Sequence, residues 1–323
     1  MRKITVGTRR SALAKTQTLQ VVDALIAANP GLVVEVMEVV TKGDRIQDRA
    51  LAEVGGKGLF VSEIEALLQE KTIDFAVHSM KDVPAELADG LTIGAVPKRE
   101  DARDLLISVN GYRLNTLPEG ARIGTSSLRR SAMLLFARRD LKVEPLRGNI
   151  DTRLRKLASL DAIILAAAGL SRMGWWQGET VSTGENTYVA VPLPPSEFIP
   201  AVGQGALALE CREDDEEVLS VLGALHDPLT FVATNAERAF LGAVGGSCQV
   251  PVAAHALASK ELGDEIHLMV EGFIGMPDGT LMVRDQVSGL ASAKLGQDLA
   301  LHMLENGGRD ILSRLAGTQS GWK

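Results

Sequence analysis

The sequence predicts an α/β protein of three parts: two similar α/β lobes followed by a smaller α+β domain. Strand-like apolar runs alternate with helix-like segments through most of the chain, and this alternation restarts after residue 103. Beyond residue 229 the pattern changes to consecutive strands. Aromatic residues make up only 4% of the 323 residues, so the cores must consist of Val, Leu, Ile and Ala, as in parallel sheets covered by helices.

The first lobe is expected to contain three parallel strands and two helices. A strand at 4–6 runs into a helix that carries Leu13 and Leu25 on its apolar face and ends at Pro30 and Gly31. The remaining elements are expected as a strand at 33–40, a helix at 59–70 and a strand at 74–78. This β-α-β-α-β order predicts a parallel sheet with helices on both faces.

The second lobe follows the charged stretch 98–103. Its expected strands lie at 105–108, 122–124, 143–146 and 162–166, and its expected helices at 127–138 and 151–157. Two similar lobes joined by a charged linker predict a cleft between them, which is a common place for a ligand site.

The third domain is expected to be α+β with an antiparallel sheet. A strand at 205–210 and a helix that starts in the acidic run 213–217 precede it, and negative charge suits a helix N-terminus. The expected elements of the domain are a helix at 229–241, strands at 252–258, 266–274 and 280–283, and a final helix at 291–305.

Charge is unevenly distributed along the chain. The formal net charge is −7, but between Arg122 and Arg172 eleven Lys or Arg stand against four Asp or Glu, a local net charge of +7 that leaves −14 for the rest. A basic segment inside an acidic protein predicts a focused anion site and argues against a general nucleic-acid binder.

Several other classes of protein do not fit the pattern. No apolar run reaches the roughly 18 residues of a membrane span, and the first residues read as a strand rather than a signal peptide. The two cysteines cannot form a disulfide framework or a four-Cys zinc site, and the five histidines lack a metal-binding spacing. We therefore expect a cytoplasmic protein with no metal site and no membrane partner.

Arginines recur where the predicted strands end and helices begin. The set comprises Arg9, Arg10, Arg129, Arg130, Arg147, Arg153 and Arg172. In open α/β sheets ligands bind at that edge, and a guanidinium group holds a carboxylate through two hydrogen bonds. Thr125, Ser126 and Ser127 precede a helix and add hydroxyl and backbone N–H donors for an anion. Any one of these arginines alone would be interpreted as a surface ion pair, but the repetition at equivalent junctions indicates a site.

Asp82 follows a predicted strand, within the segment 78–84. Its carboxylate, beside Lys81 and at an arginine-rich edge, fits a role in stabilising a cationic intermediate and moving protons. An aspartate that starts a turn before Pro84 explains the same position equally well. The residues by themselves leave both interpretations open.

The stretch Gly55-Gly56-Lys57-Gly58 resembles a phosphate loop only superficially. The P-loop pattern requires a glycine where Leu51 stands and Ser or Thr where Gly58 stands, so nucleotide binding is not expected. We interpret Lys57 as part of a lid, with a simple turn at a helix start as the alternative.

The two cysteines differ in their surroundings. Cys211 follows an apolar strand and is expected in the core. Cys248 follows Gly245, Gly246 and Ser247, where the backbone is open and the thiol accessible. Chemistry alone allows Cys248 to be a catalytic nucleophile, a cofactor attachment point or a chance free thiol.

Taken together, the motifs resemble those of the porphobilinogen deaminases, also called hydroxymethylbilane synthases. The resembling stretches are GTRRSALA at 7–14, VGGKGLF at 54–60, AVHSMKDVP at 76–84, GTSSLRR at 124–130, LRGN at 146–149, PAVGQGA at 200–206 and CQVP at 248–251. They follow one another in the family's order along nearly the whole chain.

The resemblance implies a fold and an activity. It implies two periplasmic-binding-protein-like (type II) α/β lobes and a smaller α+β C-terminal domain, with boundaries at 1–98 plus 205–223, 99–204 and 224–323. It implies a monomeric enzyme of heme and porphyrin biosynthesis that joins four porphobilinogen molecules head to tail and releases ammonia. The chain would grow on a covalent dipyrromethane primer, and hydrolysis would release the linear tetrapyrrole.

The resemblance also implies roles for particular residues. Cys248 would hold the dipyrromethane through a thioether. Asp82 would hold pyrrole N–H groups and stabilise the azafulvenium cation left when ammonia departs, and Lys81 would contact the cofactor. The binders of cofactor and substrate would be Arg9, Arg129, Arg130, Arg147, Arg153 and Arg172, with hydroxyl support from Ser11, Thr125 and Ser127.

Two other functions remain open from the residues. A non-catalytic carboxylate-binding protein would use the same two-lobe cleft, but it has no need of Cys248 or of a third domain. A thiol enzyme would use Cys248 as a transient nucleophile and would need a paired base, which no histidine close in the sequence supplies.

Overall fold

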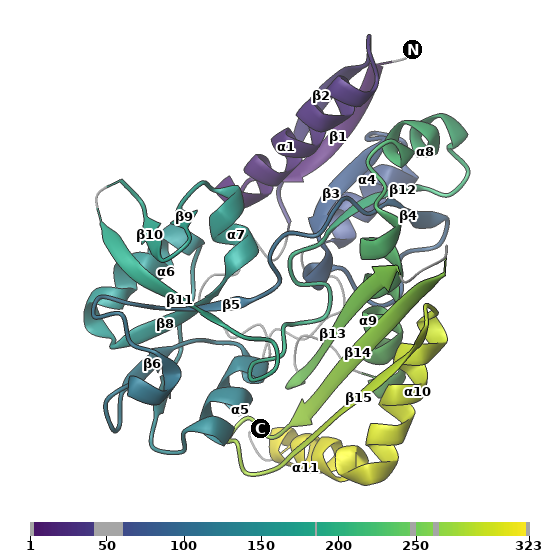
Figure 1. The fold of residues 1–323 in the computed structure, drawn as a ribbon. Coiled ribbons are helices and arrows are strands. Elements are labelled where there is room, and N and C mark those ends of the chain that lie inside the picture. Colours follow the sequence, from purple (N-terminus) through teal and green to yellow (C-terminus); the bar gives the residue numbers. More distant parts are fainter. Residues whose placement is uncertain (1–2, 42–60, 185, 246–249, 261–264, 321–323) are drawn as a thin grey trace. The chain divides into compact units, whose positions relative to one another are not determined.

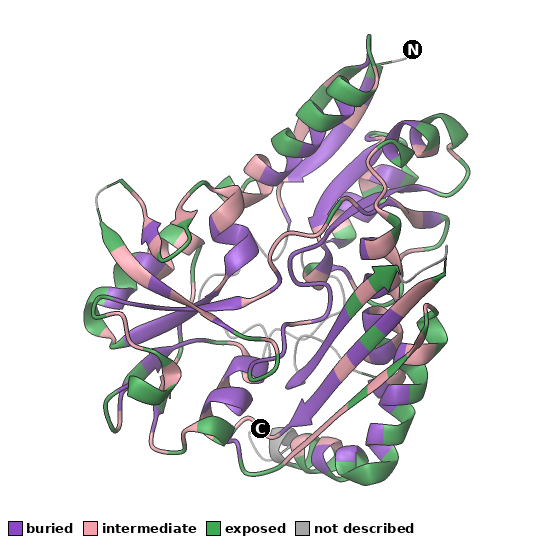
Figure 2. Cartoon of the chain, in the orientation of Figure 1, coloured by how far each residue is buried: buried purple, intermediate pink, exposed green. Residues whose placement is uncertain are grey.

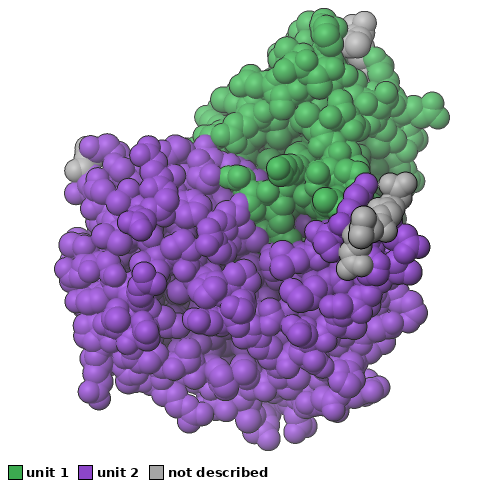
Figure 3. Space-filling view, viewed as in Figure 1, with its two compact units in different colours: residues 1–100, 203–231 green, residues 101–202, 232–323 purple. Residues whose placement is uncertain are grey.

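The computed structural model describes residues 3–41, 61–184, 186–245, 250–260 and 265–320 (Figure 1). Contacts within the chain divide it into two compact units (Figure 3). Unit 1 comprises 1–100 with 203–231, and unit 2 comprises 101–202 with 232–323. No helix in the described part of the chain is long and apolar enough to cross a membrane.

Unit 1 is built on a five-stranded mixed sheet. The strands, in spatial order, are β2 (Val33–Val39), β1 (Lys3–Arg9), β3 (Phe75–Ser79), β12 (Leu207–Arg212) and β4 (Leu91–Ala95). β1 is parallel to both β2 and β3, as predicted, but β12 is antiparallel to β3 and β4. The predicted parallel strands are thus confirmed, and the two strands whose direction was not predicted make the sheet mixed. All six residues of β12 are buried, and a strand buried on both faces carries no pattern that reveals its direction.

Helices cover both faces of this sheet, as the strand-helix alternation predicts. α1 (Ala12–Ala28) and α8 (Glu216–Gly223) pack on one face, and α4 (Ser62–Gln69) packs on the other. Along β3 the side chains alternate between the two cores: Phe75 and Val77 face α1 and α8, whereas Ala76 faces α4. Cys211 is fully buried in the first of these cores, as expected, and burial raises the pKa of its thiol to about 11.

Unit 2 contains a seven-stranded mixed sheet. Its strands, in spatial order, are β7 (Lys142–Glu144), β6 (Arg122–Gly124), β8 (Ala162–Ala166), β5 (Asp104–Ser108), β11 (Thr187–Leu193), β10 (Thr180–Ser182) and β9 (Trp176–Gln177). The three strands at the β7 edge are parallel, and β5 is antiparallel to both of its neighbours. The helices α5 (Leu128–Ala137), α6 (Ile150–Lys156) and α7 (Ala167–Arg172) accompany the sheet. β9 to β11 had no counterpart in the sequence prediction.

The same unit holds the predicted antiparallel sheet, made of β13 (Val252–Lys260), β14 (Ile266–Gly275) and β15 (Met282–Leu290). Its buried face packs on α9 (Pro228–Val244) and α10 (Ala293–Met303). In Figure 2 much of β13 and β14 has the colour of buried residues. The predicted final helix ends earlier than expected, because Asn306 and Gly307 leave helical geometry and a further helix, α11 (Arg309–Ser320), follows. Gly307 has φ +109°, a conformation that favours glycine.

One apolar core links the two sheets inside unit 2. Ala253 of β13 and Phe273 of β14 belong to the same apolar cluster as Met133 and Leu134 of α5. The turn between β14 and β15 also meets α5, since a Cβ on Gly279 would lie 2.4 Å from the backbone nitrogen of Phe136. The division of the chain into three domains stays a prediction.

Candidate active site

The first part of the site lies where β1 ends and α1 begins. Ser11 is the N-cap of α1, and its hydroxyl accepts a hydrogen bond from the backbone N–H of Ala14 at 3.3 Å. Thr18 of α1 donates to the buried Thr8 hydroxyl at 2.8 Å, which ties the helix to the end of β1. Arg9, the last residue of β1, is thereby placed at the carboxyl edge of the sheet, where ligands of open α/β sheets bind.

The second part lies on the 3₁₀ turn η1 (Met80–Asp82) at the end of β3. The turn is held by main-chain contacts: the N–H of Met80 donates to the carbonyl of Ala206 at 3.0 Å. Gly203 packs directly against it, at φ +68°, and a Cβ there would lie 2.5 Å from Cγ of Met80. A rigid backbone thus carries the exposed side chain of Asp82.

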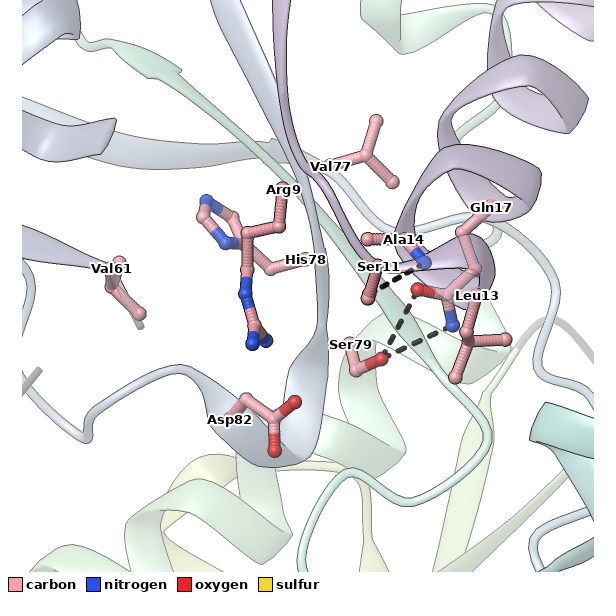
Figure 4. Close-up of a pocket in the computed structure, with 10 residues that line it drawn as sticks. All are labelled: Arg9, Ser11, Leu13, Ala14, Gln17, Val61, Val77, His78, Ser79 and Asp82. Atoms are coloured by element: carbon pink, nitrogen blue, oxygen red, sulfur yellow. Dashed lines mark hydrogen bonds between the residues drawn. The ribbon is translucent and has the colours of Figure 1, made fainter. Parts of the chain in front are cut away.

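These two strand ends line one pocket of unit 1 (Figure 4). Its lining residues are Arg9, Ser11, Leu13, Ala14, Gln17, Val61, Val77, His78, Ser79 and Asp82. In Figure 4 the Arg9 guanidinium group and the Asp82 carboxylate point toward one another. A cationic fork and a carboxylate side by side suit a ligand that carries both carboxylates and N–H donors.

The structure adds lining residues that sequence reasoning did not select. Gln17 of α1 is buried and donates to the Ser79 hydroxyl at 3.1 Å, and the Ser79 hydroxyl lies 3.3 Å from Oε1 of Gln17. Gln17 stands one helical turn after Leu13, another lining residue, and residues four apart lie on the same face of a helix. This spacing could have pointed to Gln17 from the sequence. His78 stands two residues after another buried strand residue, Ala76, and its polar ring among apolar neighbours was the signal there.

Arg129 and Arg130 of α5 occupy a different environment in unit 2. Nη2 of Arg129 lies 2.7 Å from Oδ2 of Asp104, and Nη2 of Arg130 lies 2.7 Å from Oδ1. Both arginines are nearly buried and Asp104 is fully buried. They also donate to backbone carbonyls, Arg129 to Ile199 and Arg130 to Ile164. We name this set the Asp104 cluster.

Electrostatics hold the Asp104 cluster together. Burial opposes ionisation of Asp104, but the two guanidinium groups outweigh it and keep the pKa of this carboxyl well below its usual range. Burial also lowers the pKa of Arg129, against the attraction of Asp104. With two cations and one anion, the cluster carries an excess positive charge inside unit 2.

The other predicted binders of unit 2 lie around α5, α6 and α7. Ser127 is the N-cap of α5 and accepts from the backbone N–H of Arg130 at 3.4 Å, and the buried Thr125 accepts from the N–H of Ser127 at 3.2 Å. Arg147 is half-buried after β7, Arg153 of α6 donates to the carbonyl of Gly148 at 2.7 Å, and Arg172 is the last residue of α7. Cys248 and Lys57 lie outside the described residues, and Lys81 is half-buried on η1.

Among the residues that the structure describes, no group of three or more His, Cys, Asp or Glu side chains could hold a metal ion.

Comparison with known proteins assigns the family. The family model "Porphobilinogen deaminase, dipyromethane cofactor binding domain" matches residues 4–220, and "Porphobilinogen deaminase, C-terminal domain" matches residues 231–305. The chain belongs to the porphobilinogen deaminase family. The resemblance of the motifs is thereby confirmed, together with the dipyrromethane cofactor and a transferase activity in tetrapyrrole biosynthesis.

Curated porphobilinogen deaminases cover the chain almost from end to end. The protein of Bacillus subtilis (strain 168) is 50% identical over 98% of this chain and 97% of its own length. That of Brevibacillus brevis is 51% identical over 98% of each. Among solved structures, full-length CbnR in complex with its target DNA aligns with a TM-score of 0.42 and 12% identity, over 69% of this chain and 67% of that one, which is too distant to bear on function.

Membership of this enzyme family rules out the non-catalytic binding protein. The pocket of unit 1 also passes a chemical test for part of a dipyrromethane, whose rings carry pyrrole N–H donors and carboxylate side chains. Asp82 offers an acceptor for N–H groups, and Arg9 and Ser11 offer donors for carboxylates.

Proposed function

We propose that this porphobilinogen deaminase uses Asp82 as its catalytic carboxylate and Arg9 and Ser11 as binders of the pyrrole carboxylates. The enzyme joins four porphobilinogen molecules into hydroxymethylbilane and releases ammonia. The observation that carries the residue assignment is the pocket where Arg9 and Asp82 converge from two strand ends (Figure 4).

Asp82 is suited to the ionisation of porphobilinogen. When the carbon–nitrogen bond of the aminomethyl group breaks, the electron pair leaves with the nitrogen as ammonia, and the substrate becomes an azafulvenium cation. A preorganised carboxylate beside that cation lowers the barrier, and it also accepts the pyrrole N–H. The close backbone packing of η1 against Gly203 and Ala206 supports this role, since it fixes the position from which Asp82 projects.

Arg9 is suited to hold the acetate and propionate groups that each pyrrole ring carries. It stands at the sheet edge next to the N-terminus of a 17-residue helix, where anions are favoured. We extend the proposal to Arg147, Arg153 and Arg172, which are half-buried, with Thr125, Ser127 and Lys81 in support. Arg129 and Arg130 act, in this proposal, mainly through the excess positive charge of the Asp104 cluster, because Asp104 and backbone carbonyls take several of their donors.

The dipyrromethane, when bound, supplies the primer on which the first substrate is coupled. We propose that Cys248 tethers it through a thioether. The family's cofactor and the contrast with Cys211, whose thiol is buried and has a raised pKa, support Cys248 as the attachment point. We also propose that Lys57 belongs to a lid, and that the enzyme works as a cytoplasmic monomer of three domains.

Intact mass spectrometry tests the tether. We expect the purified wild type to exceed its sequence mass by one dipyrromethane, and Cys248→Ser to lack the increment and all turnover. Cys211→Ser is the matched control and should keep both. An active wild type without added mass would contradict the thioether at Cys248. Size-exclusion chromatography with light scattering of the same sample tests whether the enzyme is a monomer.

A further inference from the structure

A buried histidine–glutamate pair lies at the pocket of unit 1, and its histidine is one of the lining residues. His78 of β3 lines the pocket and is 5% exposed, and Glu210 of the neighbouring strand β12 is 0% exposed. Nε2 of His78 lies 2.8 Å from Oε2 of Glu210, which is hydrogen-bond distance, although the bond is not linear. In Figure 4 the His78 ring lies beside the Arg9 side chain.

Burying this pair costs desolvation free energy, which lowers the stability of the fold. A carboxylate removed from water is strongly destabilising without a partner, and two apolar residues of similar volume would serve stability as well or better. Among the described residues, neither oxygen of Glu210 accepts a well-aligned hydrogen bond. Glu65 of α4 is also buried near the pair, and burial raises the pKa of its carboxyl. Fold stability therefore gives a poor account of a histidine and two glutamates buried near one another.

The contact with Glu210 also decides which edge of the His78 ring remains available. A carboxylate that faces Nε2 favours the tautomer with the proton on that nitrogen, so the lone pair lies on Nδ1. Nδ1 makes no hydrogen bond to any described residue. A carboxylate that faces a histidine in this way fixes the tautomer and the orientation of the ring, as in metal sites.

We propose that Glu210 positions His78 as the proton acceptor of the coupling step, with Asp82 left to stabilise the cation; this rests on the proposed function of the same pocket. Between two substrate-derived rings, a carbon–carbon bond forms at the free α-carbon of one pyrrole. The C–H bond at that carbon then breaks, its electron pair restores the aromatic ring, and the proton moves to Nδ1. The imidazolium is stabilised by Glu210 and passes its proton to the ammonia that the reaction releases.

His78→Gln separates this role from a structural one. The glutamine amide nitrogen can take the place of Nε2 beside Glu210, but the side chain offers no base. We expect kcat to fall by about 100-fold or more, the typical contribution of a general base, with KM nearly unchanged. Porphobilinogen deuterated at its free α-carbon should show a larger isotope effect on kcat than with the wild type, because C–H cleavage becomes slower.

Glu210→Gln and Glu65→Gln complete the set. Glu210→Gln should lower kcat by about tenfold, as loss of an orienting carboxylate does, and should change the tautomer of His78 seen in long-range ¹H–¹⁵N spectra. Glu65→Gln is the matched buried control: it keeps an acceptor for the N–H of Ala88 and should leave kcat and the isotope effect unchanged. Intact mass and melting temperature of every variant show that cofactor and fold are retained.

A His78→Gln enzyme with near-wild-type kcat, or with an unchanged isotope effect, would overturn the proposal. If His78→Gln does not fold, Glu210→Gln decides by the same isotope effect and by the tautomer. The proposed function fails differently, through a wild type that carries no dipyrromethane or makes no hydroxymethylbilane. If the wild type carries the dipyrromethane and is active, and His78→Gln leaves kcat or the isotope effect unchanged, only the role of His78 and Glu210 is rejected.

Discussion

Arginines near a strand–helix junction of each unit have different roles. Arg9 is the last residue of β1 in unit 1 and lines a pocket beside Asp82, half-buried. Arg129 and Arg130 stand in the first turn of α5 in unit 2, and they are nearly buried against Asp104. The sequence context of both is a strand, a short polar turn and a helix with a serine N-cap.

The difference comes from one carboxylate. Asp104 is the first residue of β5, and its side chain takes up guanidinium donors that would otherwise face solvent. In unit 1 the carboxylate toward which Arg9 points, Asp82, lines the pocket and is exposed. An arginine next to a strand end is thus a ligand group or a structural group according to which acidic residue the fold places opposite it.

Asp82→Asn is the most direct test of the contrast between Asp82 and Asp104. We expect turnover to fall about a thousandfold, since a preorganised charge beside a developing cation is lost, while folding and cofactor mass stay unchanged. Single-turnover kinetics with intact-mass detection measures both. Glu86→Gln, an exposed carboxylate four residues further on, should behave like the wild type. Near-normal turnover of Asp82→Asn would mean that the catalytic carboxylate was misassigned.

Asp104→Asn should instead act on stability. Removing the anion leaves two buried cations together, so we expect a loss of about 3–5 kcal/mol in the free energy of unfolding. Denaturant unfolding measures it. Asp101→Asn, which weakens a more exposed pair with Arg103, is the control and should cost about 1 kcal/mol or less.

The pH dependence of that stability follows from the lowered pKa of Asp104. A carboxyl with a depressed folded-state pKa contributes fully above its unfolded value of about 4 and loses its contribution as the pH falls further. The wild type should therefore lose stability below about pH 4 more steeply than Asp104→Asn does. Parallel curves from acid titrations at fixed denaturant would refute the ionised Asp104 cluster.

Arg9→Gln should give a smaller and purely functional effect. Loss of a charge-assisted hydrogen bond to a substrate carboxylate lowers kcat/KM about 10–100-fold. Steady-state kinetics measures it, with Arg10→Gln as control, because Arg10 is exposed and faces Glu38. Equal losses for both variants would point to general charge attraction instead of a binding site.

Ser79→Ala should give the smallest effect. It removes the hydrogen bond that joins β3 to Gln17 of α1, and we expect a loss of about 1 kcal/mol in stability together with a modest rise in KM. Thermal unfolding and steady-state kinetics measure the two. No change in either would show that the Gln17–Ser79 bridge contributes nothing to the pocket.

Much of the fold could be predicted from local signals. Ser11 and Ser127 mark helix starts through their caps, and the alternating apolar runs place most strands within a few residues. The segment around Trp176 and Val181 escaped prediction, because β9 and β10 contain two and three residues and are defined only by their pairing with longer strands. Asp82 and Arg9 were both selected from the sequence, since each follows a recognisable strand.

The sequence by itself determined the family, the order of the elements and the residue types that a pyrrole carboxylate site needs. Only the tertiary structure decided which of those residues meet. The direction of β12 places Glu210 beside His78, and the start of β5 places Asp104 between Arg129 and Arg130. Partners 132 and 25 positions apart are joined by sheet register and strand direction, and no local pattern of the chain encodes either.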